Sequence, residues 1–312
     1  EPICVKWNVT LSTMWGLGRF ADLEQFFTAG AQLGFLGFEL NHQVDSPMLQ
    51  GLELDGYRVT GVHAPCPADV PPAAVKARNW LVTSPDEDGR RQGVHAIQRS
   101  IDLAQSLGAK LVVVHAGRVD VDARLEVRLW ALYEDGLADS SEYEALKGAL
   151  IAARAEKAAA NLESAGRSIA ELAEYASRAG IRLGLENRYH YLDMPLPDEM
   201  EYLLEIAGEE RSGFLYDVGH AQTLENLGFV PHEEWLQRFA ERMIAVHLHD
   251  IQGLRDHVAA GLGEVDWDLV ARYLPLQATR TFEVRSHHTP DQVHAALEFL
   301  ASKQCIERTA VE

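Results

Sequence analysis

The chain has 312 residues, of which 47% are hydrophobic and 24% charged, with a formal net charge of −19. This length suits one large α/β barrel as well as two smaller domains. The negative charge argues against binding to a polyanion such as nucleic acid, since no cluster of Lys and Arg offsets this charge.

Three further features of the sequence concern its cellular location. No apolar run reaches the roughly 18 residues of a membrane span, and the first residues lack the basic and apolar regions of a signal peptide. Cys4, Cys66 and Cys305 are too few and too scattered for a disulfide framework or a Cys-based zinc site. We therefore expect a cytoplasmic protein.

Short β-rich runs alternate with longer amphipathic stretches from end to end of the chain. Strands are predicted at residues 3–9, 35–40, 59–64, 110–116, 181–187, 213–218, 244–250 and 280–285. Several of the intervening helical patterns end in Gly just before the next strand. Eight such units predict a parallel (β/α)₈ TIM barrel that spans residues 1–312 as one domain. A doubly wound open sheet is the competing fold, but no G-x-G-x-x-G motif follows the first strand.

One connection is longer than the others. Residues 120–152, after the fourth strand, exceed an ordinary βα loop, and the spacing of their Leu, Trp and Tyr residues indicates a helical insertion at the mouth of the barrel. A lid or substrate wall and an oligomer contact or packed decoration are alternative roles for it.

The ends of the predicted strands carry the residues most informative about chemistry. The active site of a barrel of this kind forms at the C-terminal ends of its strands. Carboxylates or imidazoles stand near six of these ends: His63, His115, Glu186, Asp217 with His220, His247 with His249, and Glu283. A lone strand-end histidine is usually structural, but convergence from six strands favours a site for Zn²⁺ or Mn²⁺.

The period of the strands places these side chains relative to one another. His247 and His249 share a face of their strand, and Gly184 shares a face with Glu186, which leaves room beneath that carboxylate. In D-V-G-H, Gly219 is expected to turn the chain so that Asp217 and His220 both face inward. A divalent-metal site built around Glu186, Asp217, His247 and Glu283 is the resulting prediction.

Several motifs also resemble a known superfamily. They are HAP (63–65), VVVHAG (112–117), LGLEN (183–187), DVGHA (217–221), HLHD (247–250), DH-x₃-G-x-G-E-x-D-W (256–267) and FEVR (282–285). Together they resemble the xylose-isomerase-like barrels, which include sugar isomerases and epimerases and the endonuclease IV-type apurinic endonucleases.

The resemblance implies two alternative ligand sets. In the isomerases and epimerases, one metal ion is held at positions matching Glu186, Asp217, His247 and Glu283; Zn²⁺ or Mn²⁺ is expected here, with Mg²⁺ and Co²⁺ as alternatives. In the endonucleases, three zinc ions also use positions matching His63, His115, His220 and His257. Their additional Asp stands two residues before that His, where this chain has Arg255, and Asp256 directly precedes His257. The third site therefore departs from the endonuclease pattern.

The leading hypothesis is a metal-dependent isomerase or epimerase of a sugar, sugar phosphate or related polyol or keto compound. Glu186 and Glu283 would transfer the proton, while the metal polarises substrate oxygens. Arg188, His249 and Arg285 are the predicted substrate-binding residues, with His190 and His220 as further candidates. Arg285 could equally be the structural partner of a nearby acidic side chain.

Other functions remain as alternatives. A zinc-dependent phosphodiester hydrolase of the apurinic endonuclease type is favoured by the full histidine set and disfavoured by the net charge. A metal-dependent lyase or dehydratase and a non-catalytic sugar-binding barrel are the others. We expect a small carbohydrate-like substrate, no nucleic acid and no membrane partner, and the sequence leaves a homo-oligomer open.

Overall fold

The computed structural model describes residues 6–54 and 56–309, and eight parallel strands form its centre. They are β1 (Lys6–Ser12), β2 (Phe35–Leu40), β3 (Val59–His63), β4 (Leu111–Val114), β5 (Arg182–Glu186), β6 (Ser212–Asp217), β7 (Met243–Leu248) and β10 (Thr279–Phe282). Each strand pairs with the next in this order, and β10 pairs with β1 to close the ring. The predicted (β/α)₈ barrel is therefore confirmed, and the open sheet is excluded.

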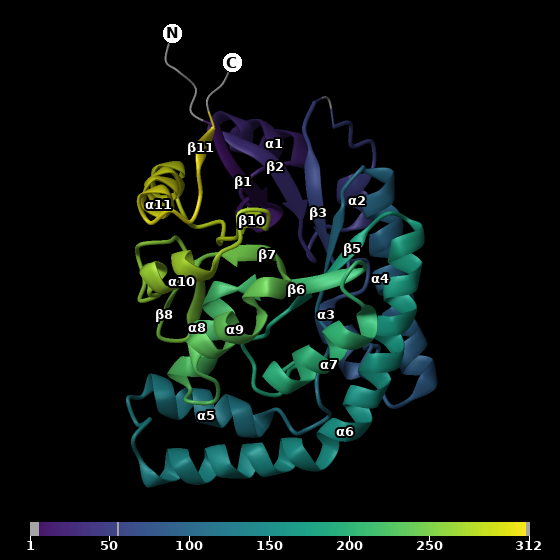
Figure 1. Cartoon of the computed structure of the whole chain (residues 1–312), viewed down its shortest axis with the longest axis vertical. Coiled ribbons are helices and arrows are strands. Elements are labelled where there is room, and N and C mark those ends of the chain that lie inside the picture. Colours follow the sequence, from purple (N-terminus) through teal and green to yellow (C-terminus); the bar gives the residue numbers. More distant parts are fainter. Residues whose placement is uncertain (1–5, 55, 310–312) are drawn as a thin grey trace.

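Three short strands lie outside the ring. β8 (Asp250–Gln252) and β9 (Arg255–Val258) form an antiparallel hairpin just after β7. β11 (Arg308–Thr309) runs antiparallel to β1, so the first and last described residues, Lys6 and Thr309, are paired. In Figure 1 this pairing lies at the end of the molecule opposite to α5.

Helices surround the ring. They are α1 (Leu23–Gln32), α2 (Ser46–Leu49), α3 (Pro72–Ala77), α4 (Glu87–Ser106), α5 (Arg124–Glu134), α6 (Ser141–Arg178), α7 (Pro197–Ala207), α8 (Val218–Asn226), α9 (His232–Phe239), α10 (Trp267–Tyr273) and α11 (Pro290–Ser302), with short 3₁₀ turns η1 (Thr13–Trp15) and η2 (Ala240–Arg242). Side chains of Asp, Ser or Thr cap the N-termini of many of them by accepting a backbone N–H bond. No helix among the described residues is long and apolar enough to cross a membrane.

Several strand boundaries differ from the prediction. Among the described residues the first strand continues to Ser12, three residues beyond its predicted end at residue 9, and Trp7, Val9 and Leu11 alternate into the core. The predicted residues 3–5 lie outside the described part. The predicted strand 244–250 is divided, since β7 ends at Leu248 and Asp250 begins the hairpin. β10 ends at Phe282, so Glu283 and Arg285 follow the strand rather than belong to it.

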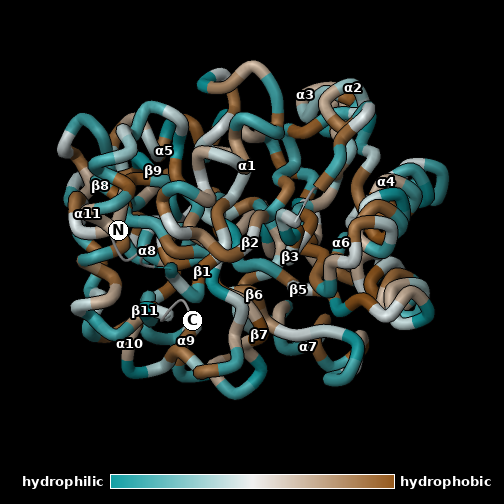
Figure 2. The backbone as a smooth tube through the Cα atoms, turned by 90° about the horizontal axis from the view of Figure 1, so that it is seen from above, coloured by the Kyte–Doolittle hydropathy of each residue, from teal (hydrophilic) through white to brown (hydrophobic). Residues whose placement is uncertain are grey.

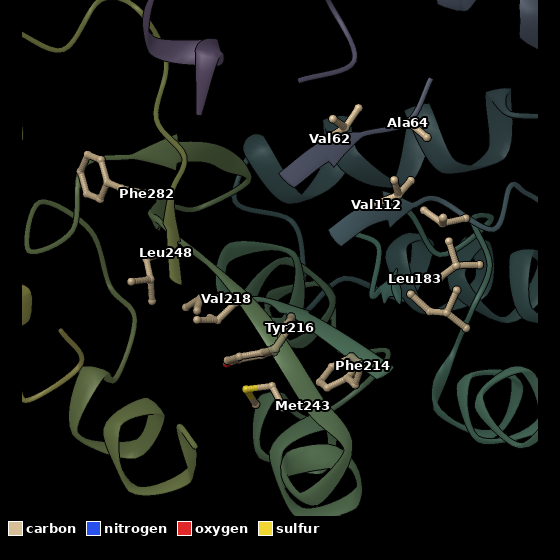
Figure 3. Packing of buried hydrophobic residues seen from close by; sticks show 14 of the residues in the cluster. Val62, Ala64, Val112, Leu183, Phe214, Tyr216, Val218, Met243, Leu248 and Phe282 are labelled. Atoms are coloured by element: carbon tan, nitrogen blue, oxygen red, sulfur yellow. The ribbon is translucent and has the colours of Figure 1, made fainter. Parts of the chain in front are cut away.

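The core has two layers. The larger lies between the ring and the helices, where Val62, Val112, Leu183, Tyr216 and Phe282 are fully buried (Figure 3). Hydrophilic residues lie along many of the outer loops and helices (Figure 2).

The smaller layer fills the ring itself with Leu111, Val113, Leu215 and Ala245. A Cβ at Gly184 would lie 3.2 Å from side-chain atoms of Leu111 and Leu215. The room that Gly184 leaves is therefore filled by these two leucines, which form an apolar floor for the mouth.

The long connection after β4 contains α5 and the start of α6 (Figure 1). α6 continues without a break for 38 residues to Arg178, so the end of the predicted insertion, up to residue 152, and the helix that precedes β5 are one element. α5 and α6 pack against each other, and α6 also packs along α4 and α7. The same helix thus belongs to both the barrel wall and the connection.

Candidate metal centre

The four predicted ligands lie at the C-terminal ends of four neighbouring strands. Glu186 ends β5, Asp217 ends β6, His247 lies one residue before the end of β7, and Glu283 directly follows β10. None of their side chains is more than 2% exposed. Parallel pairing sets Asp217 beside His247, so the strand register brings these groups together.

The two oxygens of Asp217 are used differently. Oδ1 accepts a hydrogen bond from the backbone N–H of His220 (2.8 Å), which caps α8, and lies 2.9 Å from Nε2 of His249. Oδ2 is buried without a hydrogen-bond partner, 3.6 Å from Nδ1 of His247. One oxygen therefore fixes the carboxylate while the other is free to bind.

Gly219 contributes through its lack of a side chain and not through a turn. A Cβ there would lie 2.1 Å from Cε1 of His249, so glycine allows this imidazole to reach Asp217. The residue lies inside α8 with no left-handed φ, which corrects the expectation that it turns the chain.

His247 lies between two carboxylates, one of which the sequence analysis missed. Its Nδ1 is 3.0 Å from Oε2 of Glu283, and its Nε2 is 3.1 Å from Oε1 of Glu39 on β2. Both nitrogens are close to oxygens, but neither contact has hydrogen-bond geometry. Glu39 also accepts a hydrogen bond from Oγ1 of Thr281 (3.2 Å). The position of Glu39 at a strand end was the signal that could have revealed it.

Glu186 joins the histidines of the third and fourth strands. Its Oε2 lies 3.2 Å from Nε2 of His63 and 2.8 Å from Nε2 of His115, again without an aligned hydrogen bond. Its Oε1 lies 3.1 Å from Nη1 of Arg188 and 3.0 Å from Nδ1 of His220. Glu186 is thus the centre of a buried group of mixed charge.

These unmatched atoms fit a divalent ion. A buried polar atom without a partner costs roughly 1–3 kcal/mol, so several in one place are an unusual arrangement unless a ligand satisfies them. Ligand atoms of Glu186, Asp217 and His247 lie within 4.8 Å of one another, and the same is true of Glu39, His247 and Glu283. The four predicted ligands therefore fall into two overlapping groups that share His247.

Two further groups meet the same criterion. One is His63, His115 and Glu186; the other is Asp217, His220, His249 and His257. Asp256 belongs to neither, because its carboxylate faces Nδ1 of His257 (3.0 Å) and Nη2 of Arg285 (2.5 Å). His257 has a left-handed backbone (φ 55°), a conformation that is often found at functional sites.

Electrostatics keep the carboxylates ionised. Burial raises the pKa of Glu186, but His115 and Arg188 outweigh it and hold that pKa well below its usual value. Burial also opposes the charge on Glu283, whose pKa is nevertheless lowered by His247. Charged oxygens are what a metal ion or a general base requires at neutral pH.

The predicted substrate-binding residues have different surroundings. Arg188 is largely buried, and its Nη1 lies 2.8 Å from Nε2 of His115. His249 is fully buried. The side chain of Arg285 is 54% exposed and paired with Asp256, as in the structural role considered for it.

The connection after β4 reaches this region through α5. His190 contacts Glu126 of α5 (3.1 Å), and the ring of Trp130 stacks on it at 4.9 Å. Tyr189 in turn lies 4.7 Å from the ring of His220. α5 therefore supports the loop that holds Arg188.

A cavity of about 360 Å³ opens beside the centre, lined at its inner end by His42, His115 and Arg188. His42 was also missed, because it follows β2 in a loop. Burial lowers the pKa of His42 to about 3, with the neighbouring His63 acting in the same direction, so its imidazole is neutral.

Comparisons with known proteins agree with this fold. The family model of the xylose isomerase-like TIM barrel matches residues 27–303. A solved D-tagatose 3-epimerase-like protein is 21% identical with a TM-score of 0.66, over 95% of this chain and 96% of that one. The IOLI protein, solved with a bound zinc atom, is 13% identical with a TM-score of 0.64, over 95% and 97%.

One curated relative also matches. It is the uncharacterized protein y4fM of Sinorhizobium fredii (strain NBRC 101917 / NGR234), 26% identical over 213 residues. The match covers 68% of this chain and 57% of that relative, so it extends over little more than half of the relative's length.

Proposed function

The chain belongs to the xylose isomerase-like TIM barrel family, and from this premise we propose that it is a divalent-metal-dependent isomerase or epimerase of a sugar or related polyhydroxylated keto compound. The observation that carries the proposal is the buried convergence of Glu186, Asp217, His247 and Glu283 with unpartnered ligand atoms. The similarity to a D-tagatose 3-epimerase-like protein and to a zinc-binding barrel supports it.

The two glutamates have the roles of base and acid in this proposal. In strand order Glu186 and Glu283 stand on either side of Asp217 and His247. One carboxylate takes the proton from the carbon next to a carbonyl, and the same or the other glutamate returns a proton to carbon. A bound divalent ion polarises the carbonyl and hydroxyl oxygens of the substrate.

The experiment is turnover of a panel of ketohexoses, free and carrying an apolar substituent, in D₂O by the metal-loaded protein, followed by NMR. Proton transfer through a carboxylate exchanges with solvent, so deuterium is expected on one specific carbon of the product. A product without deuterium indicates a hydride shift and contradicts the two-glutamate mechanism. If no member of this panel, free or substituted, is converted, the proposed substrate class is wrong.

A zinc-dependent phosphodiester hydrolase is the second candidate. The two further ligand groups, around His63 with His115 and around His220 with His257, favour it because they offer places for more than one ion. The net charge of −19 opposes it, since phosphate contacts from basic residues supply much of the affinity for DNA. We expect no incision of abasic duplex DNA; efficient incision at nanomolar protein would reverse the order of the two candidates.

A further inference from the structure

The cavity beside the metal centre has a mostly apolar lining and room for an aromatic ring. A cavity of about 150 Å³ already accommodates benzene, and this one measures about 360 Å³. Beyond its inner end the lining includes Pro65, Val75, Trp80, Val82 and Ile97, which come from β3–α4 and from α4 itself. Gln92 and His95 also line the cavity, but both are exposed. The apolar part of the lining therefore favours an apolar group of a ligand.

The charges around the cavity do not suit a phosphate group. Arg99 is paired with Asp69 (2.5 Å), and Arg188 contacts Glu186 (3.1 Å) and Asp193 (3.5 Å). The guanidinium of Arg118 donates to the carbonyl of Val121 (3.3 Å), and Lys76 is exposed. Among the described lining residues, no buried cation is left to bind a phosphate in the bidentate manner typical of arginine.

Among the described residues that line the inner end, His42 has a polar side-chain atom without a hydrogen-bond partner. Its Nδ1 is buried without a hydrogen-bond partner, and its ring lies 4.8 Å from that of His63 and 5.7 Å from that of His115. A polar substrate atom is therefore expected at the junction with the metal ligands, and apolar atoms beyond it.

We propose that this cavity binds an apolar substituent, about the size of an aromatic ring, of a substrate whose oxygens reach the metal centre. The inference rests on the proposed function and narrows it: the substrate is a polyhydroxylated or keto compound that carries an apolar group, not a sugar phosphate. His42 meets the substrate where its polar part ends.

Hydroxamates of matched structure test this without knowledge of the true sugar, because the hydroxamate group binds divalent metals. The probes are acetohydroxamic acid, benzohydroxamic acid and phenylacetohydroxamic acid, titrated calorimetrically into the zinc-loaded protein. Burial of a phenyl group predicts that at least one aromatic probe binds about 10-fold or more tightly than acetohydroxamic acid.

Three variants locate the effect. Ala96→Phe on α4 and Val75→Phe on α3 fill the cavity from different walls, and each is expected to bring the aromatic preference close to 1 while acetohydroxamic acid still binds. Ala159→Phe, on an exposed position of α6, is the matched control and should keep the preference. Retained acetohydroxamic acid binding shows that a filled variant is folded.

The outcomes separate this inference from the function on which it rests. If acetohydroxamic acid binds the zinc-loaded protein but the aromatic probes bind no tighter, or if neither filling variant changes the ratio, the cavity inference is wrong and the metal proposal stands. If no hydroxamate binds, the metal centre itself is wrong.

Discussion

Two buried arginine–glutamate contacts in this molecule differ in how many of their polar atoms have hydrogen-bond partners. Arg154 of α6 and Glu199 of α7 meet through two parallel contacts of 2.7 Å, and the remaining donors of Arg154 reach the carbonyls of Tyr191 (2.8 Å) and Asp193 (3.1 Å). Arg188 and Glu186 meet at the barrel mouth through a single contact of 3.1 Å, and Oε2 of Glu186 has no aligned partner.

The two contacts differ in whether their polar atoms are left available for a ligand. Glu199 also accepts a hydrogen bond from the backbone N–H of Leu196, so little of the hydrogen-bonding capacity of this pair is left for a ligand. At the mouth, carboxylates and imidazoles are equally buried but keep unmatched ligand atoms. Changes at the first pair should therefore affect stability, and changes at the mouth should affect chemistry.

The largest effect is expected at the two glutamates of the mouth. Glu186→Gln and Glu283→Gln each keep an oxygen that can bind metal but remove the base, so turnover should fall by about 10²–10⁴-fold. Steady-state rates on the substrate found in the ketohexose panel measure this. Near-normal turnover by both variants would show that neither carboxylate transfers the proton.

The matched change at the structural pair should have the opposite profile. Glu199→Ala leaves the buried Arg154 unpaired, and breaking a buried ion pair typically costs about 3–5 kcal/mol. Urea denaturation should show this loss, while metal content per folded protein stays unchanged. Loss of metal with unchanged stability would contradict the division between the two regions.

A buried neutral histidine outside the barrel mouth, His232, should affect the pH dependence of stability. His232 lies between Tyr216 and Gln222, and burial lowers its pKa from 6.5 to about 4. Because the unfolded chain takes up the proton first, this histidine stabilises the fold fully above pH 6.5 and loses that contribution as the pH falls towards 4.

The shift corresponds to about 3 kcal/mol. The unchanged protein should therefore lose unfolding free energy between pH 7.5 and pH 4.5, and His232→Gln should lose about 3 kcal/mol less over the same interval. An equal difference in the two proteins would mean that His232 titrates alike in the folded and unfolded chain.

The smallest effect is expected at Glu39. Its Oε1 lies 3.1 Å from Nε2 of His247, whose Nδ1 faces Glu283, and loss of a group that orients a ligand typically weakens metal affinity by about 10–100-fold. Competition with a fluorescent zinc chelator measures this in Glu39→Gln, with Glu199→Gln as a control. An unchanged affinity would leave Glu39 without a part in the centre.

The barrel and the convergence of the candidate ligands could be predicted because they depend on periodic patterns. Alternating strands and helices predicted the ring, and the rule that barrel sites form at strand ends brought Glu186, Asp217 and His247 together. Glu39 satisfies the same rule at the end of β2 but was overlooked, while His42 depends on the path of a loop that no period determines.

Two other differences have physical causes. Arg285 was predicted to bind substrate as part of a strand over 280–285, but β10 ends at Phe282 and strand alternation does not extend to Arg285. The insertion was predicted to end near residue 152, but α6 continues through this position from Ser141 to Arg178, and no proline interrupts it.

The central claim is that the buried groups at the mouth hold a divalent ion, and metal content by mass spectrometry tests it most directly. Protein purified from zinc- and manganese-supplemented culture should carry at least one tightly held ion per chain, and Glu199→Gln should carry the same amount. His247→Gln, which removes the ligand shared by both overlapping groups, should lose it. A protein without stoichiometric metal, or a His247→Gln variant that retains it at unchanged affinity, would contradict the account.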